Sequence, residues 1–177
     1  MQTHGTTTVT AEQTGARGIR REVPRRPSTW GVPSLTTVAE LAAWLGLTPG
    51  ELEWFADVRG WLHKAPLKAL RHYTYRWIPK RDGSARLLEI PKERLKRLQR
   101  RILDQLLSAI PVHPAAHGFC RGRSVKSFAA PHVGRCVVLR LDIRDFFPSI
   151  ARTRLQALFM TAGYPEEVAV RLSGLCT

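Results

Sequence analysis

With 177 residues, the chain is long enough for one domain with a hydrophobic core, and its formal net charge is +14 at pH 7. The charge is concentrated, because residues 64–101 contain thirteen Lys and Arg residues against three acidic residues. Such an excess is typical of a protein that binds a polyanion, since each neutralised phosphate releases condensed counterions. No apolar run is long enough to span a bilayer, and no stretch pairs a basic helical face with bulky membrane-seeking aromatics. Composition therefore favours nucleic acid over a membrane as the partner.

Cysteine usage and the N-terminus indicate where the protein works. Cys120, Cys136 and Cys176 are widely spaced and odd in number, which argues against a disulfide scaffold and suits a reducing cytosol. The N-terminus lacks the apolar core of a signal peptide, so we expect a cytoplasmic protein. Residues 1–33 are rich in Thr, Gly and Arg and poor in large apolar residues, which predicts a flexible basic tail.

Residues 34–70 are predicted to form an N-terminal helical region. Ser34 can cap a first helix over residues 35–45, which Gly46 would end. The apolar stripe of this helix consists of Leu35, Val38, Ala42 and Leu45.

A second helix is predicted from Thr48, the N-cap, with Pro49 at the first helical position and Glu51 three residues after the cap. Its apolar stripe consists of Leu52, Phe55 and Val58. The two helices suit either a small helix-turn-helix DNA reader or a helical cap on the structure that follows. The order of the later motifs favours a helical cap over a DNA reader.

A β-hairpin is predicted over residues 73–90. Residues 73–78 alternate in the manner of a strand, and residues 87–90 can return antiparallel to them. The connection contains Asp82–Gly83, the strongest short-range signal for a hairpin turn. Lys80 and Arg86 then lie at or beside the tip, either as solvated charges or as ligands for an anion.

A strongly amphipathic helix is predicted to begin at Pro91. Its apolar residues recur at helical spacing and are Leu95, Leu98, Ile102 and Leu106. Basic residues occupy the other faces, and those expected to contact nucleic acid are Arg94, Lys96, Arg97, Arg100 and Arg101. Such a helix buries one stripe and offers the rest to backbone phosphates or to water.

The segment 140–150 reads RLDIRDFFPSI and follows a run of strand formers over residues 136–141. Side chains alternate between the two faces of a strand, so Asp142 lies on the face opposite the apolar residues. Those apolar residues are Val137, Leu139, Leu141 and Ile143. A carboxylate at this place is either solvated at the end of an edge strand or a ligand for a hard cation such as Mg²⁺.

This segment resembles the first catalytic motif of bacterial reverse transcriptases of the retron and group II intron type. Further matches follow the family's order: residues 78–91 resemble its fingers hairpin, residues 95–107 its basic helix, residues 117–124 with His132 its HGF block, and residues 163–177 the helix before its next motif. Ordered matches over about residues 35–177 are more specific than any single motif.

Within the HGF block, glycines and Ser124 resemble a turn that places a helix over residues 125–130. His113, His117 and Cys120 have a spacing that suits zinc, but no second close pair completes a tetrahedral set. We therefore do not expect a zinc site in this segment.

The resemblance implies an α+β fold: the fingers and part of the palm of a right-hand polymerase, with an N-terminal helical cap and a disordered basic tail. Residues 71–135 would be fingers-like, and residues 136–177 would be the incomplete start of the palm. The family's second acidic motif, an aromatic residue followed by x-Asp-Asp, is absent from the sequence. Its only adjacent acidic pair, Glu166 and Glu167, stands where a helix is expected. We therefore expect the N-terminal part of a longer polymerase, inactive by itself.

The resemblance also implies RNA-directed DNA synthesis with two Mg²⁺ ions, an RNA template, a DNA product and deoxynucleoside triphosphates. Asp142 would be the catalytic carboxylate shared by both ions, and the backbone carbonyl of Ile143 would help to hold the second ion. Lys80 and Arg86 would hold the triphosphate. A role in antiviral defence is among those that the resemblance suggests.

Asp145, Phe146 and Phe147 would line the nucleotide site. Phe147 matches the family's aromatic residue whose ring excludes a ribose 2′-hydroxyl; the alternative makes Phe147 a core aromatic and lets Phe146 face the nucleotide. Asp145 is expected to fix the turn through hydrogen bonds to backbone N–H groups. Two alternatives to the enzyme stay open: a basic RNA- or DNA-binding module, as a short paralogue or a split subunit, and an inert truncated product.

Overall fold

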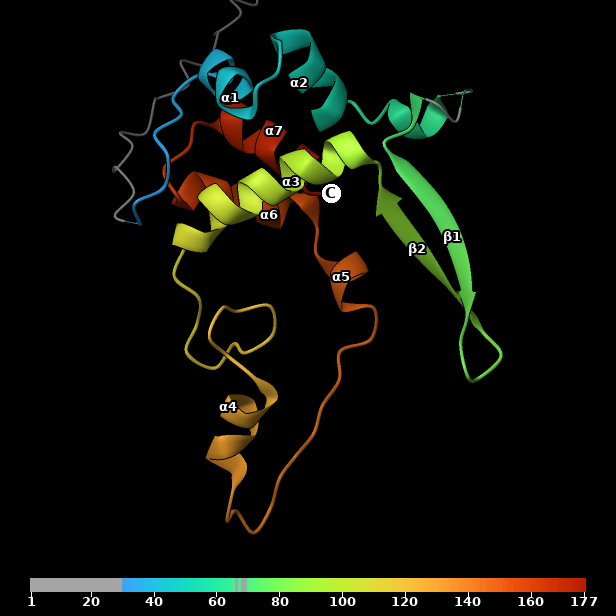
Figure 1. Cartoon of the computed structure of the whole chain (residues 1–177), viewed down its shortest axis with the longest axis vertical. Helices are drawn as coiled ribbons and strands as arrows, with labels where there is room; N and C mark the ends of the chain where they lie inside the picture. Colours follow the sequence, from blue (N-terminus) through green and yellow to red (C-terminus); the bar gives the residue numbers. More distant parts are fainter. Residues whose placement is uncertain (1–29, 66, 68–69) are drawn as a thin grey trace, which may run out of the picture.

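The computed structural model describes residues 30–65, 67 and 70–177. They form a layer of packed helices, a two-stranded hairpin beside it, and a long excursion below it (Figure 1). The predicted mixture of helix and strand is confirmed. The flexible tail predicted over residues 1–33 lies, up to residue 29, outside the described residues.

The first helix, α1 (Val38–Leu45), begins later than predicted. Ser34 does not cap it; the hydroxyl of Thr37 accepts the backbone N–H of Glu40 at 3.1 Å, so the cap lies three residues farther along the chain. Gly46 ends the helix as predicted, in the left-handed region with φ 70°.

The second helix, α2 (Pro49–Ala56), has the predicted capping box. The Thr48 hydroxyl accepts the N–H of Glu51 at 3.3 Å, and the Glu51 carboxylate accepts the N–H of Thr48 at 2.8 Å. Val58 is not part of the apolar stripe, because Asp57 turns the chain out of the helix with φ 39° and leaves Val58 exposed. A short 3₁₀ turn, η1 (Leu62–Lys64), follows.

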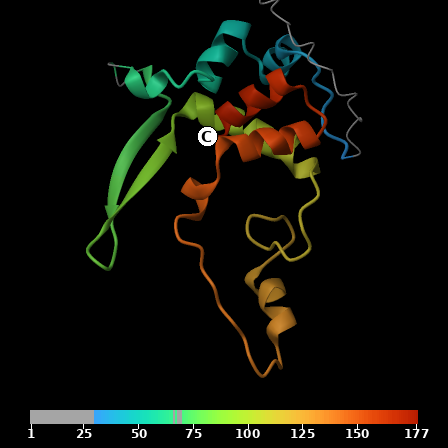
Figure 2. The ribbon, with the colours of Figure 1, turned by 180° about the vertical axis from the view of Figure 1, so that it is seen from behind.

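The predicted hairpin is confirmed as β1 (Tyr73–Pro79) and β2 (Ala85–Pro91), an antiparallel pair in which Ile78 lies opposite Arg86. Its base is fixed to the helical layer by side chains. The Gln99 amide donates to the Tyr73 hydroxyl at 3.0 Å and to the Leu175 carbonyl at 2.9 Å. The hairpin therefore projects from a fixed base, as Figures 1 and 2 show from opposite sides.

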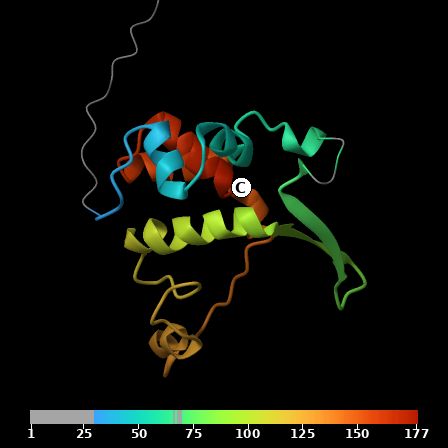
Figure 3. The same ribbon diagram turned by 45° about the horizontal axis from the view of Figure 1, so that its top comes forward.

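The basic helix, α3 (Glu93–Gln105), begins two residues after Pro91, which ends β2 instead. The physical reason is that Pro91 still pairs with Tyr73 across the hairpin. The predicted apolar stripe is confirmed: its four members are buried, and they are Leu95, Leu98, Ile102 and Leu106. Figure 3 shows α3 running along the helical layer. A 3₁₀ turn, η3 (Leu107–Ala109), follows.

The last two helices are α6 (Arg152–Thr161) and α7 (Glu166–Leu175). The helix expected near the end of the chain is thus confirmed, whereas α6 has no counterpart among the predicted elements. α7 is the central helix, since it packs against α1, α2, α3 and α6. Among the described residues, no helix is long and apolar enough to cross a membrane.

Between α3 and α6 the chain makes a long excursion through residues 111–150. It carries α4 (Val125–Ala129), the 3₁₀ turn η4 (Ala130–His132) and α5 (Phe146–Ser149). α4 is confirmed where predicted, and the hydroxyl of Ser124 caps it by accepting the N–H of Ser127. No residue from 111 to 158, a stretch described throughout, is buried.

The strand predicted over residues 136–141 is wrong for this structure. The chain is irregular there, and the apolar side chains that were expected to pack inward are largely exposed: Val137 85%, Leu139 78% and Leu141 81%. A strand requires a hydrogen-bonded neighbour, and the sheet in the described part of the chain contains β1 and β2 alone.

Candidate functional site

The tip of the hairpin presents positive charge. Lys80 follows β1, and its backbone N–H donates to the Ser84 carbonyl at 2.7 Å, which closes the loop. The Asp82 carboxylate accepts the Ser84 hydroxyl at 2.6 Å and the Ser84 N–H at 3.0 Å, and these bonds hold the pKa of Asp82 below its ordinary value. Gly83 takes φ 81°, which the turn requires. The loop geometry is therefore fixed by its own residues.

The two faces of the hairpin differ in chemistry. Residues opposite each other share a face, so Arg86, Ile78 and Arg76 lie together on one face, while Trp77 and Leu87 lie on the other. Arg86 and Arg76 are exposed, and neither forms a salt bridge within the described residues. Arg76 was not among the predicted site residues, although strand alternation alone would have placed it beside Arg86.

The segment around Asp142 is open to solvent. Asp142 is exposed in irregular backbone, and Ile143 next to it is 66% exposed. Asp145 takes a left-handed conformation with φ 49° before α5, but its side chain does not cap that helix. The expected hydrogen bonds from backbone N–H groups to the Asp145 carboxylate are thus wrong; its backbone carbonyl accepts the N–H of Ser149 at 3.0 Å instead.

Phe146 and Phe147 both point away from the core. Phe147 is 70% exposed and Phe146 49%, and their rings meet edge to face with centroids 5.5 Å apart. The alternative that made Phe147 a core aromatic is therefore wrong for this structure.

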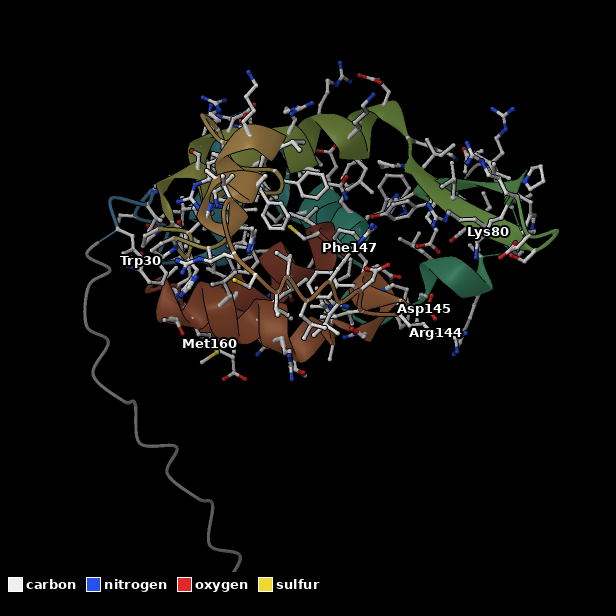
Figure 4. All side chains as sticks on the ribbon, turned by 90° about the horizontal axis from the view of Figure 1, so that it is seen from below. Trp30, Lys80, Arg144, Asp145, Phe147 and Met160 are labelled. Atoms are coloured by element: carbon white, nitrogen blue, oxygen red, sulfur yellow. The ribbon has the colours of Figure 1, made fainter. Side chains whose placement is uncertain are left out.

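The structure brings the hairpin and this segment to one side of the molecule. Figures 1 and 2 both show the hairpin tip and α5 projecting to the same side of the helical layer. Seen from that side in Figure 4, Arg144 and Asp145 lie between Phe147 and Lys80. Residues distant in sequence thus face one region, which is open in the described part of the chain.

The residues present do not form a two-metal site by themselves. Asp142 contributes one carboxylate and Ile143 one carbonyl, and the described residues contain no group of three His, Cys, Asp or Glu side chains that could hold a metal. Mg²⁺ is octahedral and takes one or two carboxylates together with water and substrate phosphates. Asp142 therefore suits a shared ligand but needs partners from elsewhere.

His113, His117 and Cys120, whose spacing in the sequence suits zinc, make local contacts in the structure. A ring nitrogen of His113 accepts the N–H of Ala115 at 3.2 Å, and one of His117 lies 3.0 Å from the Ser127 hydroxyl. These local contacts account for the two histidines.

The basic residues of α3 divide into two groups. Arg94 forms an ion pair with Glu51, and its guanidinium lies 5.2 Å from the ring centroid of Phe55. The guanidinium of Arg101 lies 5.3 Å from the ring centroid of Trp44. These two residues therefore help to hold α3 against α1 and α2. The other three are exposed and form no salt bridge among the described residues: Lys96, Arg97 and Arg100.

Comparison with known proteins identifies relatives. No protein-family model matches the chain. The chain is 47% identical over 148 residues to the retron Mx65 reverse transcriptase of Myxococcus xanthus, which covers 84% of this chain and 33% of that protein. It is 40% identical to the retron Mx162 reverse transcriptase of the same organism, over 83% of this chain and 29% of that protein. The retron Ec86 reverse transcriptase of Escherichia coli is 31% identical over 49% of this chain.

The matched region is large in this chain and small in its relatives. The matched region spans about a third of the length of the two Myxococcus xanthus proteins. Identity at this level over more than four-fifths of a chain indicates common ancestry. The chain, of which more than four-fifths is matched, therefore belongs to the retron-type reverse transcriptase family.

Proposed function

We propose that these residues form the fingers and the beginning of the palm of an RNA-directed DNA polymerase, which copies an RNA template into DNA. The observation that carries the proposal is the 47% identity to the retron Mx65 reverse transcriptase over 84% of the chain. The N-terminal helices α1 and α2 are then a cap on the fingers, because they share one core with α3 and α7.

In this proposal the basic face of the hairpin binds the triphosphate of the incoming deoxynucleotide. Arg86 offers a planar fork for two phosphate oxygens, and Lys80 offers a mobile point charge at the tip. Arg76, on the same face as Arg86, would add a third positive charge. The fixed base of the hairpin keeps these groups on the side of the molecule toward which α5 projects (Figure 1).

Asp142 is proposed to be the catalytic carboxylate, with the Ile143 carbonyl beside it. Two Mg²⁺ ions, when bound, would neutralise the charge of the phosphates and of the primer oxygen. The other acidic ligands would come from polypeptide outside these 177 residues, because the sequence has no aromatic–x–Asp–Asp motif. The alternating apolar residues before Asp142 would then form a strand, once neighbouring palm strands supply their hydrogen bonds.

A non-catalytic function is the second candidate, and one observation favours it. On α3, Lys96, Arg97 and Arg100 are exposed and form neither a salt bridge nor a cation–π contact among the described residues. A basic RNA-binding module or split subunit would use that face of α3 and would not require Asp142.

A chimera separates the two candidates. The matching region of the retron Mx65 reverse transcriptase is replaced by this chain, and DNA synthesis on an RNA template is measured. We expect an active chimera that loses activity by at least about a thousandfold with Asp142→Asn, because the amide cannot supply the negative charge that divalent ions need. Asp104→Asn, an equally conservative change on α3, is the control and should keep activity. Activity of the Asp142→Asn chimera within about tenfold of the parent would overturn the assignment.

A further inference from the structure

A cavity of about 800 Å³ lies between the end of α2, η1 and α7. Its apolar lining includes Trp54, Val58, Trp61, Leu62 and Leu70. α2 and η1 lie at one end of the helical layer, whereas the hairpin tip and α5 project below α3 (Figure 1). The cavity is therefore separate from the candidate polymerase site, and an inference from it does not depend on the proposed function.

Solvent-exposed apolar side chains border the cavity. Trp61 is 62% exposed, Trp54 41%, Leu70 43% and Val58 37%. Single exposed apolar residues are ordinary, but a cluster of large ones around a hollow marks an interaction surface. Its volume lies in the range of pockets that bury a ligand or an anchoring side chain.

The charges in the lining cancel. Arg171 forms an ion pair with Glu53, and the Asp57 carboxylate accepts the backbone N–H of Trp61 at 2.7 Å. The remaining charged residue, Arg59, has its guanidinium 5.1 Å from the Trp61 ring centroid. The cavity thus has no net charge on a chain whose net charge is +14. A polyanion has no electrostatic reason to enter it, while an uncharged apolar group is complementary to it.

A second hollow of about 130 Å³ lies next to the cavity: Asp57 and Leu62 line both, and the second hollow is also lined by Tyr73 and Tyr75 at the base of the hairpin. An extended shape of this kind suits a stretch of polypeptide better than a compact small molecule. Trp, Tyr and Arg are the residue types that dominate the energetic centres of protein interfaces.

We propose that this groove binds a segment of a partner polypeptide that presents bulky apolar side chains and carries no net charge. The largest side chain would enter the cavity between Trp54 and Trp61, and the segment would extend past Asp57 toward the tyrosines of the hairpin base.

The test is a selection from a random-peptide library displayed on phage, with the 177-residue chain as target. The same selection is run on Trp61→Ser, on Val58→Asp and on the control Trp77→Ser, which removes a tryptophan of matching exposure from the hairpin: 66% against 62%. We expect the parent and the control to enrich uncharged peptides with bulky apolar residues. Synthetic versions of these peptides should bind Trp61→Ser and Val58→Asp about tenfold more weakly or worse. Circular dichroism melting confirms that each variant is folded.

Three outcomes would overturn the proposal. Enrichment of only acidic peptides that bind all variants equally would show attraction to the basic surface and no use of the groove. Loss of single-stranded RNA binding in Trp61→Ser but not in Trp77→Ser would assign the groove to nucleic acid. Sedimentation of the parent chain as a dimer that Trp61→Ser dissociates would make a second copy the occupant.

Discussion

Gly174 lies at a close approach between two helices of the core. A Cβ atom added to it would lie 2.0 Å from the Ala56 carbonyl oxygen at the end of α2 and 2.4 Å from the Arg152 guanidinium. That guanidinium donates to the carbonyls of Ala56 and Val170, so it cannot move aside without loss of those bonds. The absence of a side chain at this one position therefore allows α7 to reach α2.

We predict that Gly174→Ala destabilises the chain by about 3 kcal/mol, the upper part of the range for overpacked cores, because the obstructing atoms belong to backbone. Gly50→Ala is the matched control: Gly50 is in α2, a Cβ atom there meets nothing within 4 Å, and alanine should stabilise by up to about 1 kcal/mol. Urea unfolding followed by circular dichroism measures both. Equal stability of the two variants would show that α7 shifts freely.

A substitution of Phe147, whose ring is exposed, tests the proposed nucleotide site (Figure 4). In the active chimera, Phe147→Ala is predicted to raise the ratio of ribonucleotide to deoxyribonucleotide incorporation by about tenfold or more, because a smaller side chain leaves room for a 2′-hydroxyl. Phe146→Ala is the control. Single-nucleotide incorporation kinetics measures the ratio, and a change with Phe146→Ala alone would transfer the role to that residue.

At the scale of the element, α2 shows how local chemistry sets stability. Hydrogen bonds from Thr48 and the nearby Arg94 lower the pKa of Glu51 from its ordinary 4.5 to about 2. The folded state thus favours the carboxylate, while the unfolded chain takes up a proton near pH 4.5. The resulting stabilisation is complete above pH 4.5 and is lost as the pH falls toward about 2.

We predict that Glu51→Gln reduces the dependence of stability on pH between 4.5 and about 2, because it removes the group whose protonation differs between the two states. Glu89→Gln on the hairpin, outside any helix cap, should preserve the dependence of the parent chain. Melting temperatures across this pH range measure the effect. An identical pH dependence in Glu51→Gln and the parent would mean that the folded state does not lower the pKa of Glu51.

The segment 137–143 shows where an element depends on its neighbours. Its period-two apolar pattern is that of a strand, yet its backbone is irregular and its side chains are exposed. The hairpin has an equally strong pattern and does form, because Asp82–Gly83 brings its two strands together locally. Among the described residues, the segment 137–143 lacks a neighbouring strand to supply hydrogen bonds. Its alternating pattern therefore predicts a strand only where such a neighbour is present.

For the whole molecule, the distribution of charge is the dominant property. Much of the excess over residues 64–101 lies in the hairpin and in α3, where Lys80, Arg86, Lys96, Arg97 and Arg100 are exposed. We predict that the chain binds single-stranded RNA with a binding constant that falls as a power of salt concentration. Replacement of Lys96, Arg97 and Arg100 on α3 by Gln should reduce the slope of log K against log salt by about 2, at about 0.7 per phosphate contact.

A control variant has the same net charge. It replaces three exposed basic residues outside α3 and the hairpin with Gln, namely Arg59, Lys64 and Arg154. Fluorescence anisotropy at several salt concentrations gives both slopes. If the two triple variants lower the slope equally, RNA binding depends on net charge alone, and the basic face of α3 is not a specific RNA-binding surface.

Much of this molecule follows from the sequence by itself. The capping box of α2, the Asp82–Gly83 turn and the buried stripe of α3 are all determined within a few residues of chain, where spacing fixes geometry. The same holds for the order of motifs that points to a reverse transcriptase, since that order is a property of the chain.

The tertiary structure alone decided the rest. It assigned Arg94 and Arg101 to contacts with α2 and α1, placed Gly174 against Ala56, and left the segment before Asp142 without a sheet. It also joined the end of α2, η1 and α7 around a cavity without net charge. Each of these depends on atoms far apart in the chain, whose meeting is set by how the helices pack, and no local pattern contains that information.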